Sequence, residues 1–351
     1  SDLGAATGED AALAELHRLR RAASSFGRHR AVAMVAIERA AHHDWGRILD
    51  DLGRRWLEAV PSGHPERRYA EALFAEVMLE RAYVELRRGG DARRQFLEIT
   101  ERTASLEAHV GYLEASLRAG VTRDALRAEY RRRFPSDDPV ERFAEAYLTG
   151  RGLPEIDDAD RHASEIERAR ALLRPVAEAL PRSPEVHHLY AYLAHRHYHR
   201  TGDGEAARAA HHRYHLALDL APYNPRQRAN LLVELGLLQA SLGNHRIALR
   251  HFNERDRLPF LEPASELSFR LARARSLFHV ASYESARAEV ARALALVDEA
   301  PSLARYRPVV LDRAALYHHA SGEHARAVEL YRALIEATSG AALAVRMKAR
   351  L

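Results

Sequence analysis

Histidine side chains could hold a metal ion, and eight of the 21 histidines in the chain fall between residues 187 and 215. His188, His195 and His199 are spaced to share one helix face, and His211 and His215 lie four residues apart, a spacing at which two imidazoles can chelate one ion. The alternatives are a zinc, nickel or copper site, a pH-sensitive surface, or a plain polar face in an Arg- and His-rich chain. Because neither a carboxylate pattern nor a His-Glu-x-x-His motif accompanies the cluster, we expect the polar face, with no metal and no cofactor.

Groups of arginines are the second feature that could carry chemistry, because guanidinium groups bind phosphates. These groups are Arg20-Arg21, Arg87-Arg88, Arg93-Arg94 and Arg131–Arg133. They are interleaved with Glu and Asp, and the chain has 53 basic against 49 acidic residues, a net charge of only +4. A nucleic-acid-binding protein usually concentrates its positive charge more strongly. We therefore interpret these groups as solvated helix ends, where the helix dipole favours cations, and expect no nucleic-acid partner.

Motifs of known enzyme classes are absent from the sequence. The chain contains no Cys, so thiolate nucleophiles, disulfides and Cys-based zinc sites are excluded. It also contains no Gly-rich phosphate loop and no G-x-S-x-G motif. We expect a protein without catalytic activity, and an enzyme of an unrecognised kind is the alternative.

The hydropathy of the chain indicates whether it can span a membrane and in which cellular compartment it is expected. The longest apolar run, Ala31 to Ile37, is far shorter than the roughly 20 residues that a membrane-spanning helix needs. Residues 1–10 do not read as an intact signal peptide, and the absence of an initial Met suggests a processed chain or a piece of a longer protein. We expect a cytoplasmic protein with no membrane span; the alternative is a periplasmic protein whose signal has been removed.

The elements that must position any site are expected to be helices throughout. Ala, Leu, Glu and Arg, which favour helices, dominate the chain, and apolar residues recur at three- and four-residue spacing, as in Leu232, Leu235, Leu238 and Leu242. Asp138-Pro139 has the pattern of a helix start. Pro175 lies inside a helical pattern and is expected to kink or break it. Helix ends are predicted at Gly120, Gly202, Gly243 and Gly322.

An internal repeat orders these helices. Ala210, Ala248, Ala286 and Ala327 are separated by 38, 38 and 41 residues. A large apolar or aromatic residue follows each by four positions: Tyr214, Phe252, Val290 and Tyr331. Such a pattern predicts antiparallel helix pairs that approach closely at small residues, such as Gly236 opposite Ala248, and that must stack on neighbours to bury their apolar stripes.

The repeat resembles the tetratricopeptide repeat (TPR) family. The best match is Leu232-x-x-Leu235-Gly236 followed by Gly243-Asn244, Ala248, Phe252 and Pro259; the resemblance is clear over about 185–336 and faint over 139–181. It departs from the family in its period of 38 to 41 residues, which exceeds the usual 34. It implies an all-α fold, a right-handed α-α superhelix of antiparallel helix pairs. We expect a flexible tail at 1–10, a helical region of divergent repeats or capping helices at 11–137, and a repeat array with a C-terminal capping helix at 138–351.

The resemblance also implies a binding groove lined by the first helix of each pair. The residues that match the groove positions are His188, His195, Tyr198, Asn230, Val233, Leu237, Ser268, Leu271, Arg275, Phe278, Asp312, Leu316 and His319. Val233 and Leu237 stand where a carboxylate clamp of this family would have Lys and Asn, so we expect no such clamp.

The function that the resemblance implies is a non-catalytic scaffold or adaptor for a protein or peptide partner. A sensory or regulatory ligand-binding domain of a larger signalling or transcription protein is the alternative. The terminal helices are candidates for self-association into a homo-oligomer.

Overall fold

A computed structural model describes residues 8–22, 32, 35–36, 40, 46–49, 51, 67–103, 105–135, 137–221, 225–258 and 263–338. The chain divides into two compact units, Ser1–Arg226 and Gln227–Leu351. Most of the predicted tail at 1–10, the residues of the predicted C-terminal capping helix after 338, and Pro259 lie outside the described residues. The predicted division of the chain at residue 138 stays a prediction.

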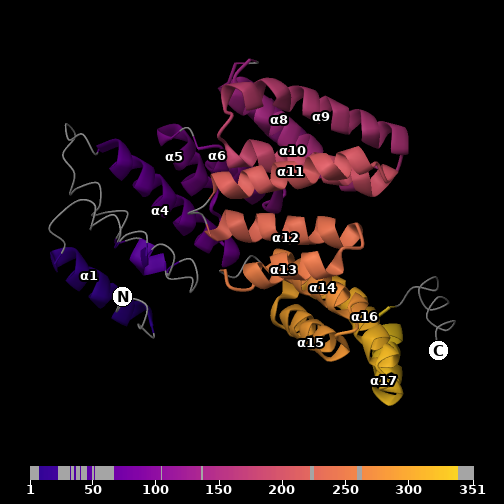
Figure 1. Cartoon of the computed structure of the whole chain (residues 1–351). Helices are drawn as coiled ribbons and strands as arrows, with labels where there is room; N and C mark the ends of the chain where they lie inside the picture. The colour runs from indigo at the N-terminus through magenta and orange to yellow at the C-terminus, as the bar shows by residue number, and fades with distance from the viewer. Residues whose placement is uncertain are drawn as a thin grey trace. The chain divides into compact units, whose positions relative to one another are not determined.

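The described part of the first unit consists of helices (Figure 1, indigo to salmon). They are α1 (Glu9–Ala22), α4 (Arg67–Arg87), α5 (Arg93–Arg102), α6 (Leu106–Arg118), α7 (Arg123–Arg133), α8 (Pro139–Gly152), the short 3-10 helix η2 (Leu153–Glu155), α9 (Ala159–Ala179), α10 (Pro184–Thr201) and α11 (Gly204–Leu220). Helices α8 and α9 form one antiparallel pair, and α10 and α11 form the next.

The second unit has the same pairwise build. Its helices are α12 (Pro225–Ser241), α13 (His245–Arg255), α14 (Pro263–His279), α15 (Tyr283–Glu299), the 3-10 helix η3 (Pro301–Tyr306), α16 (Arg307–Ala320) and α17 (His324–Ala337). Helix α14 packs on α15 and α16 packs on α17, and α15 in turn contacts α16. The described residues contain helices and turns but no strand, so the prediction of an all-α, TPR-like stack of helix pairs is confirmed.

The helix boundaries follow the predicted capping chemistry. Helix α8 starts at Pro139, and the Asp138 carboxylate accepts a hydrogen bond from the Val140 backbone N–H at 2.7 Å. Each of the four glycines that were predicted to end a helix has a positive φ, between 73° and 84°. Ala281, which takes the same turn position in the repeat, also has a positive φ, of 62°. This left-handed backbone is costly for a residue that carries a Cβ atom.

Of the two outcomes predicted for Pro175, the break is wrong, because α9 runs from Ala159 to Ala179 with Pro175 inside it. The kink stays a prediction. Proline removes one backbone donor, which leaves the carbonyl of Ala171 without its helical partner. Ala171 is exposed, so water can satisfy that oxygen. Leu173 and Val176 are fully buried on either side of the proline and anchor the helix across it.

The core of each pair forms at the small residues of the repeat. Ala210, Ala248, Ala286 and Ala327 are all buried. A Cβ atom at Gly236 would lie 2.2 Å from the Phe252 ring, so this glycine makes room for the aromatic side chain of the second helix. The Phe252 ring also packs edge-on against Phe269 of α14, with 5.8 Å between centroids, and so joins one pair to the next.

A similar contact between a glycine and an aromatic ring occurs in a part of the chain where the sequence showed no repeat. A Cβ atom at Gly111 of α6 would lie 2.2 Å from the ring of Phe96, which is fully buried on α5. Helix pairing therefore continues into the 67–133 region with other residues at the contact. Among the described helices, none is long and apolar enough to cross a membrane.

Candidate binding surfaces

The first helices of the second unit, α12, α14 and α16, carry ten of the predicted groove residues. Ser268, Arg275 and His319 are exposed, and Val233 is buried in the core. The other six are half-buried: Asn230, Leu237, Leu271, Phe278, Asp312 and Leu316. Val309 belongs to the same face of α16 and is 50% exposed. These helices therefore present apolar side chains and isolated polar groups together.

Several of these apolar side chains also hold the helix pairs together. The Phe278 ring stacks on Tyr317 of α16 at 4.7 Å between centroids and meets Tyr283 edge-on at 5.4 Å. Leu271 and Leu316 pack against the same hydrophobic cluster. Because these residues are partly committed to the core, the freely accessible part of the face comes from Arg275, Val309 and their exposed neighbours.

In the first unit, the groove candidates of α10 lie against the second helix of their own pair. His195 is only 4% exposed, and its Nδ1 lies 3.4 Å from the Tyr214 hydroxyl of α11. The His188 ring lies 6.0 Å from the same tyrosine ring. Tyr198, one turn further along, is half-buried and lies 6.1 Å from the His199 ring. The structure therefore brings His188 and His195 together around Tyr214.

Four of the five histidines considered as metal ligands form two pairs, one on α10 and one on α11. The His195 and His199 rings stack with 4.8 Å between centroids, and the His211 and His215 rings lie 4.5 Å apart. Burial, followed by the charge of His215, lowers the pKa of His211. Within the described ranges, no three or more His, Asp or Glu side chains are grouped so that they could hold a metal ion.

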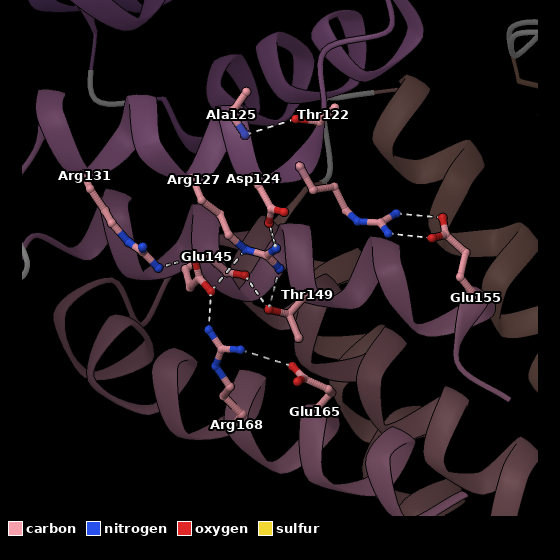
Figure 2. A network of polar contacts seen from close by, with 11 residues as sticks. Thr122, Asp124, Ala125, Arg127, Arg131, Glu145, Thr149, Glu155, Glu165 and Arg168 are labelled. Atoms are coloured by element: carbon pink, nitrogen blue, oxygen red, sulfur yellow. Dashed lines mark hydrogen bonds and ion pairs between the residues drawn. The ribbon is translucent and has the colours of Figure 1, made fainter. Parts of the chain in front are cut away.

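The arginines of α7 take part in an ion-pair network rather than a free basic patch (Figure 2). Its centre is Glu145 of α8, whose side chain is 6% exposed and whose carboxylate contacts Arg127 at 3.2 Å, Arg131 at 3.4 Å and Arg168 of α9 at 2.5 Å. Asp124 pairs with Arg127 at 2.9 Å. Carboxylates thus accompany these arginines, and the network fixes α8 between α7 and α9.

A second buried network lies at a repeat position that is apolar elsewhere. Arg255 of α13 follows Ala248 by seven residues, where the other repeats have Ala217, Ala293 and Leu334, and it is 2% exposed. It forms a salt bridge with Glu266, which is 1% exposed and which also meets Arg270 at 2.9 Å. The Arg255 guanidinium carbon lies 4.2 Å from the centroid of the Phe269 ring. This charged pair joins α13 to α14.

Sequence reasoning missed one polar face, which lies on α4 and α6 of the first unit. Glu76, Glu80 and Tyr83 recur at helical spacing on α4, and Glu107 begins α6. The Tyr83 hydroxyl donates a hydrogen bond to the backbone carbonyl of Glu107 at 3.5 Å. The i, i+4, i+7 spacing on α4 was a visible signal. Its partner on α6, however, is evident only from the fold.

The sequence matches no protein-family model and no curated protein. Among solved structures, it is similar to YrrB, described as a TPR protein with an unusual peptide-binding site, at 16% identity and a TM-score of 0.41, over 61% of this chain and 93% of that one. It is also similar to the Cut9–Hcn1 hetero-tetramer of APC/C, at 14% identity and a TM-score of 0.44, over 99% of this chain and 53% of that one.

Human IFIT1, in a dimer with m7Gppp-AAAA, is a third similar structure, at 16% identity and a TM-score of 0.37. The match covers 95% of this chain and 87% of that chain. At such identities and TM-scores, these three structures identify neither a partner nor a ligand for this chain.

Proposed function

We propose that the protein is a non-catalytic scaffold that binds a protein or peptide segment on the face formed by α12, α14 and α16 of the second unit. The observation that supports this most is the composition of that face. Val309 is an aliphatic side chain that stays 50% exposed, and exposed Arg275 lies on the neighbouring first helix. Peptide-binding surfaces combine apolar contact with a few polar groups that fix orientation.

The charges of this face favour a particular kind of segment. Arg275 and Arg313 are exposed, whereas Asp312, the acidic residue beside them, is half-buried. A peptide with a carboxylate near Arg275 would gain a charge-assisted hydrogen bond, and an apolar side chain would cover Val309. We therefore expect an acidic peptide with at least one aliphatic or aromatic anchor.

The experiment starts from peptides selected on the full chain by phage display and measures their affinity by fluorescence anisotropy. The test protein carries Arg275→Glu and Val309→Asp, two changes at exposed positions that leave the core intact. The matched control carries Arg332→Glu and Val328→Asp on α17, a second helix, where Arg332 is exposed and Val328 is 37% exposed. Both proteins undergo the same change in charge and the same two types of substitution.

We expect the test protein to bind a selected peptide at least tenfold more weakly than the control, with unchanged melting temperatures. Equal affinities of the two variants for every selected peptide would remove this face as the binding surface.

A further inference from the structure

Three arginines of the first unit lie around one tyrosine, Tyr190 of α10, a helix that packs against both α9 and α11. The Tyr190 hydroxyl donates a hydrogen bond to the backbone carbonyl of Arg170 on α9 at 3.3 Å. The guanidinium carbon of Arg213, on α11, lies 5.1 Å from the centroid of the Tyr190 ring. Arg174 follows Arg170 by one helical turn, and a long side chain at that position leans back towards the preceding turn. Arginines from two helices therefore meet at this tyrosine.

Two contacts hold the Arg213 side chain in place. Besides the Tyr190 ring, its Nη1 contacts Nδ1 of His187, a buried residue of α10, at 2.9 Å. Nε2 of His187 lies 2.9 Å from the backbone carbonyl of Pro181, and because a carbonyl can only accept, this nitrogen carries the proton. Burial lowers the pKa of His187, and the charge of Arg213 acts in the same direction. The neutral imidazole therefore orients Arg213 without compensating its charge.

Positive charge is in excess around Tyr190. Arg170 pairs with Glu167 at 2.7 Å, but both side chains are largely exposed, so this pair is weak. Neither Arg174 nor Arg213 forms an ion pair with a carboxylate among the residues that the structure describes. Burial raises the pKa of the Tyr190 hydroxyl, and the charges of all three arginines oppose that rise. Since Arg170 and Arg174 are exposed, an anion from solvent can reach them.

The number of guanidinium groups indicates which anion fits this surface. A carboxylate has two oxygens and one negative charge. A phosphate monoester has three terminal oxygens and a charge of about −1.5 to −2 at neutral pH. Groups of arginines recognise such phosphates because each planar guanidinium can donate two parallel hydrogen bonds. Three arginines therefore match a phosphate better than a carboxylate.

The surroundings favour a phosphate that is carried on a protein segment. Glu167 and Glu178 are exposed on α9 before and after the two arginines, so the continuous phosphate backbone of a nucleic acid would be repelled on both sides. A free small ligand binds in a concave site that buries most of its surface, whereas Arg170 and Arg174 project from an exposed helix face. A single phosphate on a larger partner meets neither obstacle.

We propose that the surface formed by Arg170, Arg174, Tyr190 and Arg213 binds a phosphorylated side chain of a partner protein. The two exposed arginines of α9 pair with the phosphate oxygens, and Arg213 supplies a positive charge at a fixed position. This surface belongs to the first unit and is independent of the face proposed for the second unit.

The test screens the full chain against a peptide library with a fixed central phosphoserine and randomised flanks, and measures the best peptide by fluorescence anisotropy at about 0.15 M salt. The comparison ligands are the same peptide without its phosphate, the same peptide with Asp at that position, orthophosphate, and oligo-uridine RNA. The test variant is Arg174→Gln, at an exposed position. The matched control is Arg161→Gln, an exposed residue near the start of the same helix, whose replacement changes the net charge equally.

We expect the phosphopeptide to bind at least tenfold more tightly than each comparison ligand. Arg174→Gln should weaken that binding at least fivefold, Arg161→Gln should leave it unchanged, and both variants should keep the melting temperature of the unaltered protein. Arg174→Lys keeps the charge but not the planar fork, so it should recover part of the affinity. Equal binding of the phosphorylated and unphosphorylated peptides, tighter binding of orthophosphate or RNA than of the phosphopeptide, or equal weakening by Arg174→Gln and Arg161→Gln would overturn the proposal.

Discussion

Acidification should destabilise the first unit through one buried histidine, His109 of α6. This side chain is 2% exposed, its Nδ1 lies 3.1 Å from the Tyr130 hydroxyl, and its ring packs edge-on against Tyr130 and Phe134. Burial, followed by the charge of Arg133, lowers the pKa of His109 from 6.5 to about 4. The folded protein therefore resists protonation that the unfolded chain accepts.

The sign and size of the effect follow from linkage. Above pH 6.5 the imidazole is neutral in both states and contributes no pH dependence. As the pH falls below 6.5, only the unfolded chain gains a proton, and stability is lost until the folded pKa near 4 is passed. At pH 5 the loss from these two pKa values is about 2 kcal/mol, and at pH 4 it is about 3 kcal/mol.

The assay is urea unfolding followed by circular dichroism at pH 7.5 and pH 5.0. His109→Gln keeps a polar group near Tyr130 but cannot titrate, so it should lose about 2 kcal/mol less stability between the two pH values than the unaltered protein. His212→Gln, at an exposed site of α11, should behave like the unaltered protein. Equal losses of stability in His109→Gln and in the unaltered protein would refute this reasoning.

Three further predictions concern the second unit, with stability read from urea or thermal unfolding. Gly236→Ala should lower the free energy of unfolding by about 1–3 kcal/mol because the added Cβ would clash with the Phe252 ring. A second change, Phe252→Leu, should recover part of that loss, whereas strictly additive effects would contradict the contact. Ala281→Gly should stabilise the protein by about 0.5–1 kcal/mol because φ is 62°, whereas a destabilised variant would contradict the left-handed backbone. Arg255→Met should lower the free energy of unfolding by about 3 kcal/mol because the buried Glu266 carboxylate loses one of its positively charged partners. The added change Glu266→Gln should restore much of that stability. A single variant as stable as the unaltered protein would show that the pair is not buried.

The helix pairs could be predicted from the sequence because the residues that begin and end each helix act within a few positions of the chain. Gly243, Gly322 and Asp138 end or begin helices through their own backbone and side-chain chemistry, so short spacing was enough to place them. The small residues of the repeat, such as Ala248, are buried because close helix approach requires them. The helix continues through Pro175, which its local sequence did not indicate, because buried residues on both sides of the proline pack against other helices.

The candidate surfaces were less predictable because they depend on contacts between helices. His195 shares the first-helix spacing of the groove positions, yet it faces Tyr214 of the neighbouring helix. Arg255 occupies an apolar position of the repeat because Glu266, eleven residues later, compensates its charge. The carboxylates around Tyr83 come from α4 and α6. They lie close together only because the two helices pack against each other, which the sequence of a single helix does not show.

The claim that the first helices of the second unit bind a peptide is tested most directly by photo-crosslinking. A selected peptide is mixed with full-length protein that carries p-benzoylphenylalanine at Val309 on α16 or, in a separate sample, at Val328 on α17, and crosslinks are identified by mass spectrometry. We predict a peptide crosslink from position 309 that excess unlabelled peptide suppresses, and none from position 328. Crosslinking from position 328 but not from position 309 would contradict the account.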